Sequence, residues 1–300
     1  MFMLRCHERI SMQKRMCLLV ALLSLTLIQA FGVTNFASRI WTAGFGTLSL
    51  VLIYYLGKKL YNRPVGFLSA IVLGTFITYN VFARYAMTDV PLTCFILASV
   101  YFFVLSEEKE KQIRNATLSG LFFGLALMTK QIAALLIPLI IFAYLVTTRR
   151  SLRFLFRKSF TLLWGVGLLL FSPWLIYMAA RFGNQFWQWY FLYADVARSA
   201  STVEGHFASY FFCFNYLAHN DNWLWLALLP FAVGTCAYEA IAKRKKPDIL
   251  VFLWMAIVLL LFSLAQTKIY WYIMPVFPAF ALTIAALLFL FVRRITQKLR

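Results

Sequence analysis

The chain has 300 residues, of which 63% are hydrophobic and 13% charged, and its mean hydropathy is +0.78. This composition excludes a soluble globular domain of that length. The net charge of +19 does not indicate nucleic-acid binding, because the basic residues gather between apolar runs. Apolar runs of membrane-spanning length predict an all-α fold, a polytopic transmembrane helical bundle with about eight to ten membrane helices. We treat residues 1–300 as a single membrane-embedded domain.

In chain order the apolar runs cover residues 16–31, 40–56, 65–82, 91–105, 116–148, 159–180, 222–240 and 249–264, followed by a last helix that ends at 293–294. The run 116–148 is long for one crossing: a single helix would measure about 50 Å against a hydrocarbon core of about 30 Å. Both of its flanks are basic, which predicts a hairpin of two short helices that turns at Lys130. The ammonium group would then lie in a cavity; the alternative is a lysine that snorkels to headgroups.

The basic residues are unevenly divided between the connections. The connections at 58–63, 109–114, 149–158, 243–246 and 293–300 hold 19 of the 29 Lys and Arg. The alternate connections hold six, among them Arg84, Lys130 and Lys268. The positive-inside rule places the rich set in the cytoplasm and the poor set outside.

Asp89 is the one acid between Val65 and Leu105, and it lies in a short connection between two apolar runs. A carboxylate at the rim of a bilayer usually faces a cavity, a partner or a substrate. The alternative is a helix N-cap, since Pro91 follows shortly after. The connections with few basic residues therefore offer one carboxylate, Asp89, and several cations. These cations are Arg84, Lys130, and Lys268 beside Tyr272. Such a set could bind a phosphate and take a proton from a hydroxyl nucleophile.

The connection 181–221 is the longest one predicted outside the cytoplasm. It carries a dense aromatic cluster that includes Trp187, Trp189 and Tyr193. Amphipathic aromatics suit the membrane interface, and we also consider them as contacts for an acceptor or a lipid. The five cysteines and the histidines show no metal-ligand spacing, so no metal site is predicted.

Several short motifs, in order, carry a family resemblance. They are Phe31-Gly32-Val33 through Ser38-Arg39, Tyr85-Ala86-Met87-Thr88-Asp89-Val90-Pro91-Leu92, Gly120 to Gly124 leading to Met128-Thr129-Lys130, Pro173-Trp174, and Lys268-x3-Tyr272-x2-Pro275-x2-Pro278. The chain resembles the GT-C membrane glycosyltransferases of the protein O-mannosyltransferase and aminoarabinose (lipid A) transferase type.

The resemblance implies transfer of a sugar from a polyprenyl-phosphate donor to a lipid or protein acceptor outside the cytoplasm. It implies Asp89 as a catalytic carboxylate and Arg84, Lys130, Lys268 and Tyr272 around the donor phosphate. The implied partners are the lipid-linked donor, the acceptor and the membrane, with no nucleic acid, and no cofactor beyond the donor substrate is implied. The implied location is the bacterial cytoplasmic (inner) membrane, with the active face extracytoplasmic.

One departure concerns the start of the chain. The family has a first helix and a long outer loop with an Asp-Glu pair whose Asp is the expected base. No Asp precedes Asp89 here, and the earlier acid Glu8 lies in an unlike basic context. We therefore expect an N-terminally truncated member. Two alternatives remain: a transporter or flippase for an amphiphile, and a non-catalytic membrane subunit.

Overall fold

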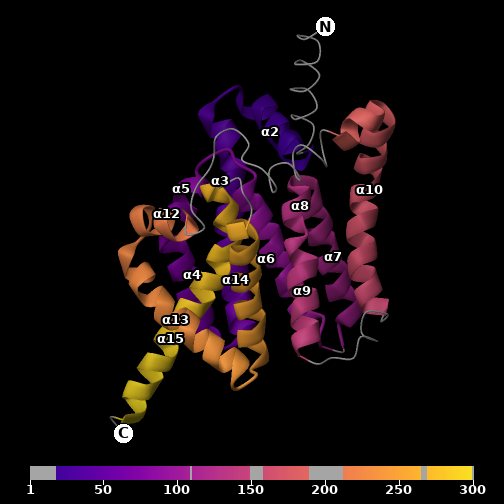
Figure 1. The fold of residues 1–300 in the computed structure, drawn as a ribbon. Coiled ribbons are helices and arrows are strands. Elements are labelled where there is room, and N and C mark those ends of the chain that lie inside the picture. Colours follow the sequence, from indigo (N-terminus) through magenta and orange to yellow (C-terminus); the bar gives the residue numbers. More distant parts are fainter. Residues whose placement is uncertain (1–17, 109, 149–157, 189–211, 265–268, 299–300) are drawn as a thin grey trace.

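The computed structural model describes residues 18–108, 110–148, 158–188, 212–264 and 269–298, and within these ranges it contains helices and no strands (Figure 1). Its elements are α2 (Leu18–Phe31), α3 (Asn35–Leu60), α4 (Arg63–Thr75), α5 (Ile77–Ala83), α6 (Asp89–Leu105), α7 (Gln112–Thr129), α8 (Gln131–Ala134), α9 (Leu136–Thr147), α10 (Lys158–Trp187), α12 (Phe212–Asn220), α13 (Trp223–Ile241), α14 (Lys246–Leu264), η3 (Tyr270–Val276) and α15 (Phe277–Lys298).

Five helical stretches in the described part are long and apolar enough to cross a membrane. They are Asn35–Leu60, Thr161–Trp187, Trp223–Ile241, Lys246–Leu264 and Tyr270–Gln297. The bent pair α4 and α5 brings the number to six, and Asp89–Leu105 and Gln131–Thr147 are shorter apolar helices. The predicted all-α membrane bundle is confirmed, with some of its helices shorter than a full crossing.

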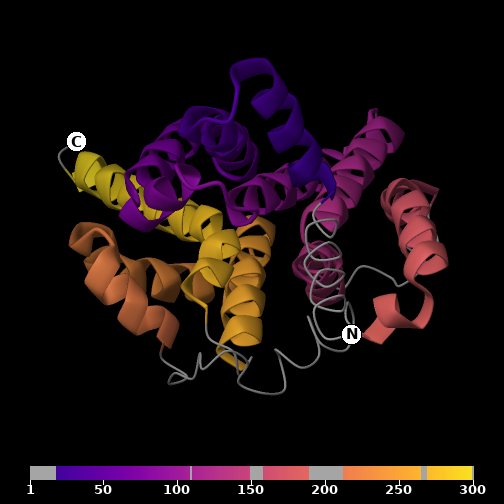
Figure 2. The ribbon, with the colours of Figure 1, turned by 90° about the horizontal axis from the view of Figure 1, so that it is seen from above.

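Helix α6 packs against α3, α7, α9 and η3. Seen from above, α13 (orange) and α10 (salmon) lie on opposite sides of the bundle (Figure 2). The α6 residues from Asp89 to Val100 are all buried. The α6–α7 contact includes two reciprocal hydrogen bonds. The Ser99 hydroxyl donates to the Ser119 carbonyl oxygen (2.9 Å), and the Ser119 hydroxyl donates to the Ser99 carbonyl oxygen (2.7 Å). Such bonds between helices stabilise packing where no water competes for the polar groups.

The α7–α10 contact depends on small residues. A Cβ atom added at Gly120 would lie 2.3 Å from the Leu163 carbonyl oxygen, and one at Gly167 would lie 2.4 Å from the Phe123 ring. The backbones therefore approach as closely as glycine allows, as in small-xxx-small pairs of membrane helices. The Gly120 to Gly124 motif of the sequence thus has a packing role.

The predicted run 65–82 is not one straight helix. It bends by 70° between α4 and α5, where Phe76 adopts an extended conformation. Asp221, at the α12–α13 connection, caps the N-terminus of α5: its carboxylate accepts from the Ile77 amide (2.9 Å) and the Thr78 amide (3.3 Å). The amides freed by the bend are thus paired within the protein, as a membrane environment demands.

Two predicted boundaries shift. The helical stretch α10 continues past Ala180 to Trp187 with a break at Gly183 (φ 54°, ψ −134°). Helix α12 occupies 212–220, so part of the predicted connection 181–221 is helical. The two prolines of the last segment lie where the helix type changes. Pro275 lies in the 3-10 helix η3, and Pro278 lies in the first turn of α15. Proline suits a first turn because its missing N–H has no partner there in any case.

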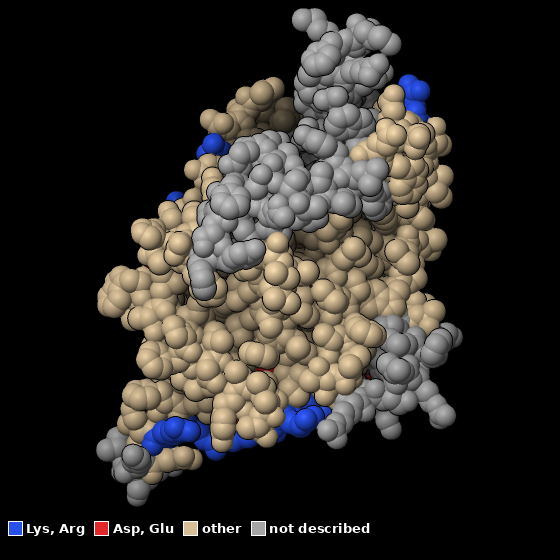
Figure 3. Space-filling model, in the orientation of Figure 1, with Lys and Arg blue, Asp and Glu red and all other residues tan. Residues whose placement is uncertain are grey.

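Most of the described basic residues gather at one end of the bundle, which we call the basic end and which lies at the bottom of Figure 3. It comprises Lys58, Lys59, Arg63, Lys111, Arg114, Lys243, Arg244, Lys245, Lys246, Arg293 and Arg294. At this end the Tyr61 hydroxyl donates to Asp248 Oδ1 (2.8 Å). Burial, and after it the nearby Asp248 carboxylate, raises the pKa of Tyr61, which keeps this hydroxyl a donor.

Candidate active site

Asp89 is the first residue of α6 and lies at the opposite end of the bundle from the basic end. It is 4% exposed. It is not the N-cap: that position is Thr88, whose side chain makes no capping bond. The positive N-terminal end of α6 favours a carboxylate in this turn. Pro91, two residues on, is tolerated there for the same reason as Pro278.

Lys130 lies in the break between α7 and α8, at the turn of the predicted hairpin. Its backbone is extended (φ −158°, ψ 96°), and both arms of the turn pack against α6. The hairpin predicted from the length of the run 116–148 is therefore present, with its turn at Lys130 (Figure 1). Lys130 Nζ lies 2.8 Å from Asp89 Oδ1, and 28% of the lysine side chain is exposed. A buried carboxylate thus meets a partly exposed ammonium group.

Tyr272 completes this group. Its ring centroid lies 4.1 Å from Lys130 Nζ, a cation–π distance. The ring is carried by η3, which is held against α14 because the Trp254 indole donates to the Pro275 carbonyl oxygen (2.9 Å). Three segments distant in sequence therefore place Asp89, Lys130 and Tyr272 together.

The chemistry of this trio follows from the geometry. Asp89 accepts one proton of the ammonium group, and the Tyr272 ring lies beside the charge. An ammonium group has three donors, so Lys130 keeps donors for a further acceptor on its exposed side. A cation oriented in this way suits an anionic ligand such as a phosphate.

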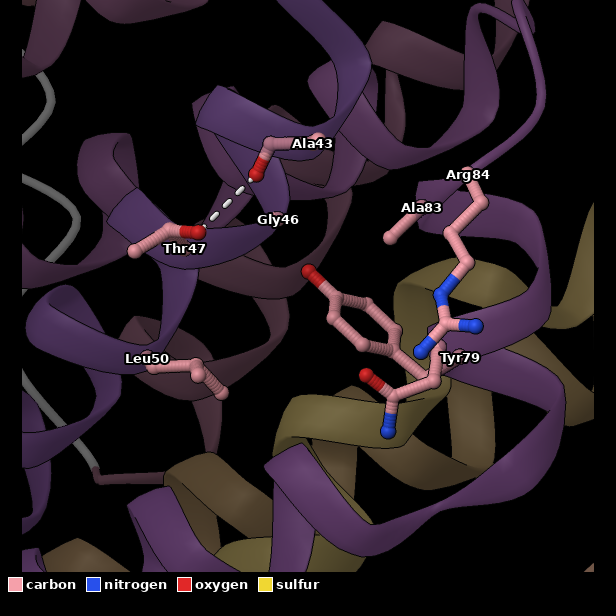
Figure 4. Close-up of a pocket in the computed structure, with 8 residues that line it drawn as sticks. Ala43, Gly46, Thr47, Leu50, Tyr79, Ala83 and Arg84 are labelled. Atoms are coloured by element: carbon pink, nitrogen blue, oxygen red, sulfur yellow. Dashed lines mark hydrogen bonds between the residues drawn. The ribbon is translucent and has the colours of Figure 1, made fainter. Parts of the chain in front are cut away.

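Arg84, the other predicted cation in this part of the chain, lines a separate pocket between α3 and α5 (Figure 4). That pocket includes Ala43, Thr47 and Tyr79 and none of the trio. Lys268, Trp189 and Tyr193 lie outside the described residues. Trp187 lies at the end of α10, which packs on α7, and 44% of it is exposed.

Sequence reasoning missed the aromatic stack that supports η3. The Tyr216 ring of α12 stacks on Tyr270, with centroids 4.8 Å apart and planes 8° apart. Tyr270 in turn meets Trp271 edge-on. The signal was the run Tyr270-Trp271-Tyr272, but its partner on α12 lies more than fifty residues earlier in the chain.

A family model described as dolichyl-phosphate-mannose-protein mannosyltransferase matches residues 5–177, more than half of the chain. The chain belongs to this family. The motifs of this chain around Asp89 and Lys130 fall within the matched range, and the motif around Tyr272 lies beyond it.

Among curated relatives, an undecaprenyl phosphate-alpha-4-amino-4-deoxy-L-arabinose arabinosyl transferase of Erwinia tasmaniensis is 30% identical over 85% of this chain and 46% of its own length. The protein of the same name from Aeromonas hydrophila is 30% identical over 86% of this chain and 47% of its own. This family member therefore spans about half the length of the curated relatives it matches.

Solved structures agree on the fold. The crystal structure of ArnT from Cupriavidus metallidurans bound to undecaprenyl phosphate gives a TM-score of 0.77 at 18% identity, covering 89% of this chain and 48% of that one. The Archaeoglobus fulgidus oligosaccharyltransferase gives 0.61 at 11% identity, covering 93% and 43%. The chain is an integral membrane protein with the GT-C fold predicted from its sequence.

Proposed function

We propose that this chain is part of a glycosyltransferase that moves a glycosyl group from a polyprenyl-phosphate-linked sugar to a lipid or protein acceptor. The observation that carries the proposal is the Lys130 ammonium group, held 2.8 Å from Asp89 Oδ1 and 4.1 Å from the Tyr272 ring centroid. The family membership and the names of the relatives support the same reaction class.

Lys130 would stabilise the phosphate that leaves the sugar. In the transfer, the bond between the anomeric carbon and the phosphate oxygen breaks while the acceptor oxygen bonds to that carbon. The acceptor proton passes to a base, and negative charge builds on the departing phosphate. A preorganised cation at this place stabilises the developing charge without reorganisation. Lys268 is proposed as a second cation at the same phosphate.

Asp89 would act as a positioning residue in this arrangement. Its carboxylate is nearly buried and already accepts from Lys130, so it fixes where the ammonium group lies. Trp187, Trp189 and Tyr193 are proposed as contacts for the acceptor or lipid, since amphipathic rings suit the interface. The proposed location is the bacterial inner membrane with the trio facing outward, which the sparse positive charge at this end supports.

The decisive experiment is transfer of radiolabelled 4-amino-4-deoxy-L-arabinose from its undecaprenyl phosphate to membrane acceptors. It compares the chain of 300 residues with the same chain extended in frame at both ends. Activity in the extended form that requires the donor supports the proposal. Uptake or flipping of the donor without transfer would favour a transporter, and an inactive extended form that restores activity to a separate transferase would favour a subunit.

A further inference from the structure

The pocket between α3 and α5 has features of an anion site. Its volume is about 150 Å³, whereas a single water needs about 10–15 Å³ on the same measure. Figure 4 shows the Arg84 side chain reaching down beside the Tyr79 ring, which forms the inner wall. Tyr79 is 2% exposed, and Arg84 is exposed. The pocket therefore has a buried aromatic wall and a cation at its mouth.

A second arginine precedes the pocket residues on α3. Arg39 is on α3 four residues before the pocket residue Ala43, which places it one helical turn away on the same face. Its guanidinium carbon lies 5.8 Å from the centroid of Tyr85, the neighbour of Arg84. In the described part of the chain, neither arginine makes an ion pair with a carboxylate. Among the described residues, neither guanidinium group therefore has an acidic partner.

The surroundings favour a lipid over a free ion. Leu50, Gly46 and Ala83 give the lining an apolar part. Thr47 and Asn80 add polar side chains beside Arg84. Apolar side chains elsewhere on α3 and α5 are exposed: Phe36 is 59% exposed and Val81 42%. Helix α3 is long and apolar enough to cross the membrane, so we expect the exposed side chains along it to meet lipid. A ligand with a phosphate above an apolar body matches both parts.

We propose that this pocket binds the phosphate of an anionic membrane phospholipid, with Arg39 and Arg84 as its ligands. Guanidinium groups pair with phosphate oxygens through two parallel hydrogen bonds, which an ammonium group does not match. The site shares no lining residue with Asp89, Lys130 and Tyr272. It is therefore a second lipid site, and it does not depend on the proposed transfer reaction.

The test measures which lipid the detergent-purified full-length protein retains, by native mass spectrometry after exchange with phosphatidylglycerol or phosphatidylcholine. The wild type is expected to retain phosphatidylglycerol preferentially. Arg39→Gln and Arg84→Gln are each expected to weaken this retention about tenfold, the equivalent of one charge-assisted hydrogen bond. The control Arg181→Gln removes an exposed arginine of α10 and is expected to retain the lipid.

A variant that leaves the charges intact separates the pocket from general attraction. Ala43→Leu places bulk in the pocket and is expected to lower phosphatidylglycerol retention while both arginines remain. Equal losses in Arg181→Gln and Arg84→Gln would overturn the proposal in favour of general surface charge. Displacement of the lipid by millimolar inorganic phosphate would also overturn it, since the site would then be one for a free anion. Because no sugar transfer is measured, failure here leaves the transferase proposal standing.

Discussion

Lys130 lies between a carboxylate and an aromatic ring, and these two partners hold it by different forces. The ion pair with Asp89 fixes its direction, and the Tyr272 ring adds a cation–π contact. Removing one partner of a buried pair leaves the other charge uncompensated, which costs more than the pair itself contributes. The two partners can therefore be tested separately.

We expect Asp89→Asn to lower the transfer rate of the full-length protein about tenfold to a hundredfold and to weaken donor binding, because Lys130 loses its direction. The double variant Asp89→Asn/Lys130→Met should be no worse than Lys130→Met alone, since the two residues act through one contact. Kinetics with varied donor measure this. Asp248→Asn, a buried acid at the basic end, serves as the control; additive losses in the double variant would contradict the coupling.

Tyr272→Phe keeps the ring and should leave donor affinity close to that of the wild type. Tyr272→Leu removes the ring beside the ammonium group, and a contact worth about 0.5–2 kcal/mol is lost. Donor affinity should then fall about twofold to thirtyfold. Titration of the purified variants with undecaprenyl phosphate measures both. If Tyr272→Phe binds as weakly as Tyr272→Leu, the hydroxyl rather than the ring holds the donor.

At the scale of the helices, close packing and capping position the site. The hairpin α7–α8–α9 presents Lys130, and α7 is held by α10 through glycines. The bend between α4 and α5 is held by Asp221. The glycine packing and the Asp221 cap are both contacts between segments that are far apart in the chain.

Gly120→Ala should destabilise the protein, because the new Cβ would lie 2.3 Å from the Leu163 carbonyl oxygen and force α7 and α10 apart. Gly165→Ala is the matched control on α10, where an added Cβ meets nothing within 4 Å. There alanine should stabilise the helix by about 0.5–1 kcal/mol. Thermal unfolding in detergent should thus shift in opposite directions; equal shifts would contradict the packing argument.

Asp221→Ala should loosen the start of α5 by about 1 kcal/mol, because the Ile77 and Thr78 amides lose their acceptor. Hydrogen exchange of these two amides should then be faster by about fivefold or more. Asp221→Asn keeps an oxygen acceptor and should show most of the wild-type protection. Unchanged exchange in Asp221→Ala would mean that the bend holds without this cap.

For the whole molecule, the charge asymmetry predicts orientation. The basic end should face the cytoplasm, and the end with Asp89 and Lys130 should face outward. Cysteines introduced at Trp223, which is 77% exposed at the start of α13, and at Ile295 near the end of α15 report on the two ends. In spheroplasts a thiol reagent that does not cross membranes should label Trp223→Cys only. Labelling of Ile295→Cys before lysis would reverse the orientation.

The sequence by itself determined the membrane class, the order of the helices, the family and the turn at Lys130. These properties depend on composition, on the length of apolar runs and on local charge, which are readable along one chain. The prediction that Asp89 is a site residue also used local sequence alone, because a single acid in a long apolar run needs a partner. Domain limits and the roles of the site residues stay predictions.

Only the tertiary structure decided which charges meet. The sequence offered both Arg84 and Lys130 as cations for the site of Asp89. In the structure Lys130 pairs with Asp89, whereas Arg84 lines another pocket with α3. The 70° bend after Thr75 was not predicted. Its cap could not be read locally, because Asp221 is more than a hundred residues along the chain from Ile77. Spacing in sequence fixes the neighbours along a helix, whereas the packing of helices fixes which distant side chains share one site.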